Sequence, residues 1–226
     1  MYRPALSRLV FRVVGLLVLP ILALPTACGA PPPEEPKPRP LPEDTQTLSP
    51  GTYRSEEFEP SFSFTIGEGW TNQPLETSDN LALTWGRTWL LRFFKPQVVY
   101  EPNERYGVVD APKDLIGWLR RHPYVRASTP EPVTVGGVEG ERMDVTVVGL
   151  PEDHVGACGP DCLDLFGLSD GSALGLLRGE KARGTVLEDV EGETLIIGFV
   201  GPADEFDVLA AETPQKVIDS VEWRDE

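Results

Sequence analysis

The side chains with the most specific chemistry in this sequence are Cys158 and Cys162, the two ends of the segment Cys-Gly-Pro-Asp-Cys. In an oxidising compartment, two cysteines this close together favour a disulfide that closes a small Gly-Pro turn. A thioredoxin-like redox site is not favoured, because its cysteines are separated by two residues and here they are separated by three. We therefore predict a structural disulfide, which stabilises mainly its own short loop.

A zinc site is the alternative use of the same residues. His154 stands four residues before Cys158, so His154, Cys158 and Cys162 could bind zinc together with a nearby carboxylate. The spacing matches no standard zinc pattern, and thiols outside the cytoplasm tend to oxidise. We therefore expect no bound metal and no cofactor.

The third cysteine, Cys28, follows an N-terminal segment that is typical of secretory signals. Three arginines precede an apolar run over residues 13–25, which is shorter than the about 20 apolar residues that span a bilayer. Residues 24–29, Leu-Pro-Thr-Ala-Cys-Gly, resemble a bacterial lipobox, in which the cysteine is acylated and becomes the first residue. We predict a signal peptide over residues 1–27 and lipidation of Cys28, with ordinary cleavage and free secretion as the alternative.

The segment after this cysteine has the composition of a linker. Residues 29–50 contain eight prolines and several acidic side chains, which cannot bury a core and which favour an extended chain. We expect residues 28–50 to hold a domain up to about 60 Å from the membrane. A single globular domain is expected over residues 51–226.

The composition also limits the class of partner. The chain has 226 residues with Lys+Arg 20 and Asp+Glu 36, and its formal net charge is −16. Binding to a phosphate backbone needs clustered lysine and arginine, so we expect no nucleic-acid partner. The same shortage of basic residues argues against binding to anionic lipid through a polybasic segment.

The elements that position these residues are mostly strands. Alternating apolar residues and turn signals predict two hairpins, through residues 86–88 and through Glu191-Gly192. Helices are expected after Asp110, as an N-terminal cap, and after residue 202, with a break at Pro214. Together these elements predict an α+β fold with an antiparallel β-sheet flanked by helices. The expected strands are residues 62–66, 81–85, 89–94, 98–100, 133–135, 139–148, 173–177, 185–190 and 194–200.

Three short motifs in this pattern resemble PsbP-like domains. Residues 62–66 with Gly69-Trp70 resemble the opening strand of that superfamily, residues 136–140 its central hairpin, and residues 217–221 its closing helix. The resemblance extends to small actinobacterial lipoproteins of the LpqN type. It implies an α/β/α sandwich used for binding or assembly, and residues 150–184 depart from it as an elaboration. No ligand residue of the superfamily maps onto this chain, so the ligand-binding residues are unknown.

No catalytic residues are predicted, because the sequence contains no Gly-x-Ser-x-Gly, His-Glu-x-x-His or phosphate-loop motif. Acidic residues within 188–193 fall at a hairpin end, where such side chains are usually solvated rather than bound to calcium. Trp118 and Trp223 could lie on the surface, while the other tryptophans fall in or beside apolar strands. Carboxylate pairs for sugar hydrolysis depend on tertiary distances and stay open.

These observations predict a non-catalytic binding or accessory module of the cell envelope. The module would lie outside the cytoplasm, anchored to the bacterial cell membrane through an acylated Cys28. Its partner would be an envelope protein or a small ligand. The alternative function is a small secreted hydrolase that uses carboxylates.

Overall fold

A computed structural model describes residues 37–74, 76–102, 107–210 and 212–224, which belong to one unit by their contacts. The predicted signal peptide and Cys28 lie outside the described residues. Within the described ranges, we find no helix with the length and apolar character needed to span a bilayer.

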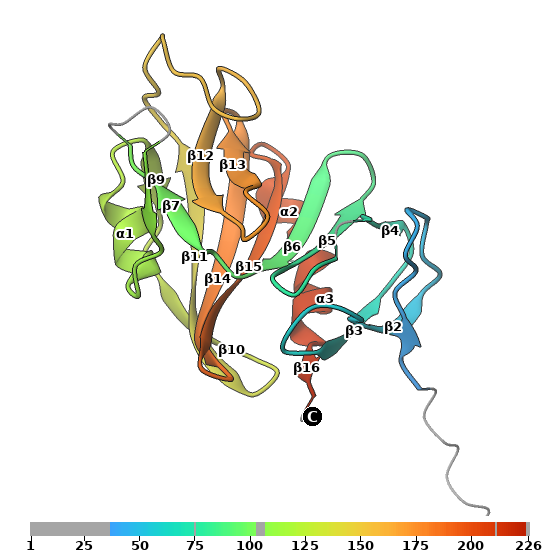
Figure 1. The fold of residues 1–226 in the computed structure, drawn as a ribbon. Helices are drawn as coiled ribbons and strands as arrows, with labels where there is room; N and C mark the ends of the chain where they lie inside the picture. The colour runs from blue at the N-terminus through green and yellow to red at the C-terminus, as the bar shows by residue number, and fades with distance from the viewer. Residues whose placement is uncertain (1–36, 75, 103–106, 211, 225–226) are drawn as a thin grey trace, which may run out of the picture. The chain divides into compact units, whose positions relative to one another are not determined.

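The centre of the fold is an antiparallel sheet built from the segments with alternating apolar residues (Figure 1). Its two longest neighbours, β14 and β15, are joined by Glu191 and Gly192, which both have positive φ as a two-residue hairpin turn requires. A further strand, β9 (Val125–Ala127), pairs with β11. The order of the other strands is β10 (Glu131–Val135), β11 (Val138–Val147), β14 (Glu180–Val190), β15 (Glu193–Pro202), β6 (Trp89–Phe94), β5 (Asn80–Trp85) and β4 (Trp70–Asn72).

Two small sheets and three short helices complete the fold. One sheet has the order β1 (Arg39–Pro40), β2 (Gly51–Arg54), β3 (Phe62–Ile66) and β16 (Glu222–Trp223). The other has the order β13 (Ala173–Leu177), β12 (Cys162–Gly167), β7 (Val98–Tyr100) and β8 (Val108–Asp110). The helices are α1 (Leu115–Arg121), α2 (Phe206–Leu209) and α3 (Pro214–Asp219).

Each face of the central sheet forms its own apolar core, because successive side chains of a strand point to opposite faces. On β6, Leu91 and Phe93 pack with β3, α2 and α3, whereas Phe94 packs with α1 and β12. On β15, Ile197 joins the first core and Ile196 the second. Figure 1 accordingly shows α1 and the β12–β13 hairpin on one side of the long strands, with α2 and α3 on the other.

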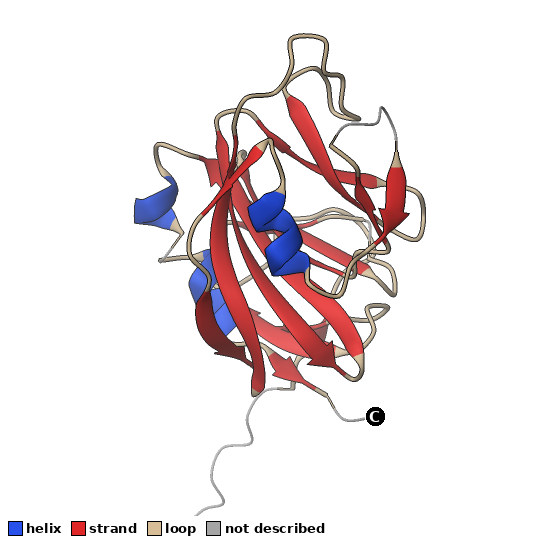
Figure 2. Cartoon of the chain, turned by 90° about the vertical axis from the view of Figure 1, so that its left-hand side faces the viewer, coloured by secondary structure: helices blue, strands red, loops and turns tan. Residues whose placement is uncertain are grey.

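The α/β/α sandwich expected from the sequence is wrong. The three helices cover 7, 4 and 6 residues, and strands dominate the described chain (Figure 2). The small sheet of β1, β2, β3 and β16 covers one face of the central sheet together with α2 and α3. The small sheet of β12, β13, β7 and β8 covers the other together with α1. The fold is therefore a mostly β arrangement in which strands occupy most of the outer layers.

The start of α1 also differs from the prediction. Asp114 is the N-terminal cap, and its side chain accepts a hydrogen bond of 2.6 Å from the Gly117 amide. Asp110, the expected cap, ends β8 instead, where it pairs with Val98. The preceding strand pairing therefore delays the helix by one turn.

The second half of the expected linker is part of the folded unit. Leu41 and Leu48 are buried in the same core as Phe62 and Phe64. The side-chain amide of Asn72 donates hydrogen bonds to two carbonyl groups of this segment, and its oxygen accepts one from the backbone of Gln46. The linker boundary at residue 50 is corrected accordingly, and residues 28–36 of the linker lie outside the described residues.

Candidate functional site

The core between the central sheet and the β12–β13 hairpin is incomplete, and it holds a cavity of about 220 Å³. Apolar side chains form nearly all of the wall. The residues that line the cavity are Leu90, Arg92, Phe94, Leu119, Met143, Val145, Leu165, Phe166, Ala173, Leu174, Gly175, Leu176, Ala182, Gly184, Val186, Ile196, Gly198 and Val200.

Two glycines paired across β14 and β15 form the floor of the cavity. Gly184 lies opposite Gly198, and the same cross-strand row continues to Met143 on β11 and to Arg92 on β6. A Cβ atom at Gly184 would meet no atom within 4 Å, and one at Gly198 would meet only Phe94 at 3.6 Å. Neither glycine has a positive φ, so the backbone does not require glycine at either position. The cavity exists because two side chains are missing from this row.

The β12–β13 hairpin forms the roof. The register between these strands shifts between Asp164 and Phe166, which leaves Leu165 as an extra residue on β12. A bulge of this kind turns the strand and redirects a side chain. As a result, the consecutive residues Leu165 and Phe166 both line the cavity, together with Leu174 and Leu176 of β13.

The cavity has a closed inner end and an open mouth. Phe94, Met143 and Leu165 are buried at the inner end. Leu90 and Leu174, in contrast, are half-buried and lie where solvent reaches the cavity. A ligand can therefore enter without unfolding the roof.

Arg92 is the single charged side chain that the described part of the chain contributes to the cavity wall, and it is half-buried. Its Nε atom is buried and has no hydrogen-bond partner among the described residues. Burial lowers the pKa of the Arg92 guanidinium, and the negative charge of Asp170 opposes that shift. A buried donor without an acceptor costs free energy, so this group favours an anion or another acceptor beside it.

The tip of the roof is fastened to the central sheet by a buried carboxylate. Asp79, which precedes β5, accepts a hydrogen bond of 2.9 Å from the Ser169 amide in the β12–β13 turn. Burial alone would raise the pKa of Asp79, but hydrogen bonds from Ser169 and Thr77 hold it below its ordinary value. Asp170, in the same turn, accepts a hydrogen bond of 2.8 Å from the Ser172 amide.

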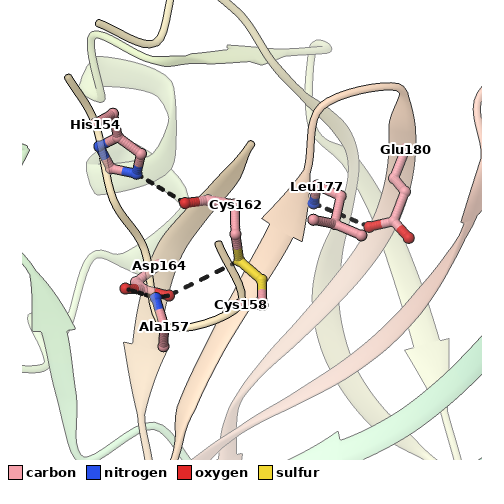
Figure 3. Close-up of a disulfide and its surroundings, with 7 residues drawn as sticks. All are labelled: His154, Ala157, Cys158, Cys162, Asp164, Leu177 and Glu180. Carbon is pink, nitrogen blue, oxygen red and sulfur yellow. Dashed lines mark hydrogen bonds between the residues drawn. A yellow bond between two sulfur atoms is a disulfide. The ribbon is translucent and has the colours of Figure 1, made fainter. Parts of the chain in front are cut away.

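The base of the roof is fastened by the disulfide that joins Cys158 and Cys162, the pairing expected from the sequence. Asp164 on β12 accepts a hydrogen bond of 2.8 Å from the Ala157 amide, and the His154 ring lies 2.7 Å from the Cys162 carbonyl oxygen (Figure 3). The zinc alternative is not supported, because a disulfide leaves neither sulfur free as a thiolate ligand. No cluster of three metal-ligating side chains is found in the described ranges.

His122 lies buried at the end of α1, one turn from the cavity residue Leu119. Its Nδ1 accepts a hydrogen bond of 3.2 Å from the Tyr124 amide, and its Nε2 has no partner within the described part of the chain. Burial lowers the pKa of His122 to about 4, so the ring is neutral at ordinary pH. Its ring contacts Trp118, which in turn contacts the roof residue Phe166.

The other residues singled out from the sequence lie outside the cavity wall. Trp118 and Trp223 are half-buried, and the Trp223 indole donates a hydrogen bond of 3.0 Å to the Val135 carbonyl. The acidic side chains at the β14–β15 turn are exposed, and Asp189 accepts a hydrogen bond from the Gly192 amide. None of these groups converges on the cavity.

The roles of Arg92 and of the glycine pair were not predicted from the sequence. The sequence places Arg92 in a buried strand, and a charged residue inside Trp-Leu-Leu-Arg-Phe-Phe is the signal that could have identified it. Gly184 and Gly198 interrupt strands that are otherwise typical of β structure, and glycine inside a strand often marks the close approach of a ligand.

No protein-family model matches this chain, and a comparison with curated proteins finds no match. Among solved structures, cyanobacterial PsbP from Synechocystis sp. PCC 6803 is similar, with a TM-score of 0.42 and 10% identity over 78% of this chain and 94% of that protein. LpqN of Mycobacterium tuberculosis, described as involved in cell envelope biogenesis, is similar with a TM-score of 0.37 and 8% identity over 80% and 91%. These are the two kinds of protein that the sequence motifs resemble.

Proposed function

We propose that this chain is a non-catalytic binding module that takes an apolar or amphipathic ligand into the cavity above the Gly184–Gly198 pair. The glycine pair is the observation that carries the proposal. The wall that this pair leaves uncovered is apolar, and solvent reaches it through the mouth, although ordinary side chains at the two positions would cover it. Apolar surface exposed to water costs free energy, so a space kept open where the backbone does not require glycine is best explained by a ligand.

We propose further that the module works outside the cytoplasm. The signal-like residues 1–27 and the lipobox-like motif at Cys28 support anchoring to the bacterial cell membrane. The disulfide fits an oxidising compartment. Mass spectrometry of the mature N-terminus tests the anchor, because an unmodified Cys28, or its absence, would indicate the freely secreted alternative.

The cavity favours binding over the alternative of a carboxylate-dependent hydrolase. Such an enzyme needs two carboxyl groups that converge on the bound substrate. Among the residues that the structure describes, those that line the cavity include no aspartate and no glutamate. We therefore do not propose hydrolysis at this site.

A neutral fluorescent probe, N-phenyl-1-naphthylamine, tests the proposed binding, because its phenyl ring is small enough for the cavity while its naphthyl ring can extend through the open mouth. We expect its fluorescence to increase with the wild-type protein and not with Gly184→Ile, whose side chain fills the cavity. The matched control is Gly67→Ile, because a Cβ there also meets nothing within 4 Å but the residue is exposed and far from the cavity wall. Equal fluorescence from the wild type and Gly184→Ile, or none from the wild type, would contradict the proposal.

A further inference from the structure

We infer that the ligand of this cavity is a single-chain amphiphile with an acidic head group, whose acid lies against Arg92 while its alkyl chain lies on the Gly184–Gly198 floor. This inference rests on the proposed function, because it specifies the ligand class of the same cavity.

The acidic head group follows from the state of Arg92. Its buried Nε has no hydrogen-bond partner among the described residues. In the same part of the chain, no carboxylate oxygen lies within 4.0 Å of an Arg92 nitrogen. A guanidinium presents a planar fork of donors that matches the two oxygens of a carboxylate or a phosphate. A neutral ligand would leave the guanidinium without a close countercharge, whereas an acid at the mouth would supply one beside its accessible end.

The alkyl chain follows from the wall and the size of the cavity. Every other side chain in the wall is apolar, so the buried part of the ligand has no hydrogen-bond partner there and must itself be apolar. An apolar cavity of about 150 Å³ holds benzene, with six carbon atoms. By the same ratio, a cavity of about 220 Å³ holds about nine carbon atoms, which is one medium-length chain and not two.

One carboxylate, that of Asp170, acts on Arg92 electrostatically, and it should weaken the binding of an acid. Asp170 acts on the guanidinium through its charge, and Asp79 ties the turn that carries Asp170 to the sheet. Asp170 is fully exposed, so it attracts Arg92 across solvent and would also repel an incoming acid. Asp170→Asn keeps an oxygen for the Ser172 amide and removes that repulsion.

The experiment is calorimetric titration of the full chain with three ten-carbon probes, decanoate, decyl phosphate and decanol, each below its aggregation concentration. We expect at least one of the acids to bind ten times more tightly than decanol. Arg92→Met should weaken acid binding at least tenfold and leave decanol binding unchanged, and Arg92→Lys should retain part of the preference for the acid. Asp170→Asn should strengthen the binding of acids alone.

The control for a general charge effect is Arg87→Met, which removes an exposed arginine from the β5–β6 turn and should change no affinity. Tighter binding of decanoate identifies the head group as a carboxylate, and tighter binding of decyl phosphate identifies it as a phosphate. Equal affinities for the two acids indicate that the site accepts either head group. If decanol binds as tightly as the acids and Arg92→Met changes nothing, the acidic head group is wrong while the proposed binding function stands. If neither these probes nor the neutral fluorescent probe binds, both proposals fail.

Discussion

At the scale of single residues, buried polar groups without hydrogen-bond partners lower the stability of this fold. Arg92 and His122 each place a nitrogen in the interior without a partner among the described residues. Arg92 stays beside the cavity mouth, where a ligand can complete its contacts. His122 has no such opening, and its neutral ring therefore makes the stability of the protein depend on pH.

We expect the protein to lose stability in mild acid because of His122. Its pKa is about 4 when folded and 6.5 in the ordinary state, so the unfolded chain binds a proton that the folded chain does not bind between these values. The contribution is complete above pH 6.5 and is lost as the pH falls towards 4. Urea unfolding should show a free energy of unfolding about 2 kcal/mol lower at pH 5 than at pH 7 from this group.

The variant that isolates this effect is His122→Asn, which retains an acceptor for the Tyr124 amide. Its stability should change less between pH 7 and pH 5 than that of the wild type. His154→Gln is the matched control, because it removes the other histidine of the chain and should keep the wild-type difference. Parallel pH profiles for the wild type and His122→Asn would contradict the assignment.

At the scale of elements, the roof hairpin is positioned by few contacts at its two ends. The Asp79 carboxylate holds the tip, and the Cys158–Cys162 loop with Asp164 holds the base. A Cβ atom at Gly175 of β13 would lie 2.7 Å from the Cys162 sulfur, so the disulfide packs closely against the roof. The disulfide therefore has a role in the position of the cavity as well as in stability.

Removing the disulfide should weaken ligand binding and should lower the free energy of unfolding only modestly. A loop of five residues is worth roughly 2 kcal/mol by the chain-entropy relation, so Cys158→Ser with Cys162→Ser should lower the free energy of unfolding by at most about that amount. We expect N-phenyl-1-naphthylamine to bind more weakly, because β12 loses its fixed base. Unfolding curves and probe titrations of the double variant check both parts, and unchanged probe affinity would argue against a bracing role.

Local sequence patterns predicted many of the strands. The register between strands, however, depends on tertiary contacts, which a local pattern does not show. Alternation and the turn at Glu191-Gly192 are local signals, and both are confirmed in β14 and β15. If the pairing continued from this turn without interruption, Thr185 would lie opposite Gly198. A one-residue bulge between Leu187 and Val190 shifts the pairing, so that Gly184 takes this place and the floor of the cavity forms.

Strand β12 of the outer layer escaped prediction for a related reason. Strand β12 is buried along its whole length and shows no alternation, so the pattern of Cys162–Gly167 does not distinguish it from a loop or a helix segment. Its partners β7 and β13 are short, and β7 is distant in sequence. Arg92 and the glycine pair become a site only when this hairpin covers them.

At the scale of the whole molecule, the fold begins earlier than the composition indicates. Proline-rich sequence argues for a linker, yet Leu41 and Leu48 enter the core and β1 pairs in parallel with β2. The apolar residues are sparse in this segment, but two well-placed leucines and the hydrogen bonds of Asn72 are sufficient to dock it.

Truncation tests the docked segment. A chain that begins at residue 49 should have a free energy of unfolding about 3 kcal/mol lower than a chain that begins at residue 37, because two buried leucines are lost. The control is Thr45→Ala in the chain that begins at residue 37, because Thr45 is an exposed residue of the same segment and its substitution should leave the stability unchanged. Thermal or urea unfolding measures the difference, and equal stability of the chains beginning at 37 and 49 would contradict the role of Leu41 and Leu48.

Docking of residues 37–50 also changes how far the module can travel from its anchor. If Cys28 carries the lipid, and if residues 28–36 form the tether that their composition predicts, the tether has about 9 residues in place of the about 23 of residues 28–50. The effective concentration of a tethered domain falls roughly as the −3/2 power of tether length, so the shorter tether raises it about fourfold. A module on this short tether would meet amphiphiles as they leave the bilayer surface, before they are diluted into the surrounding water.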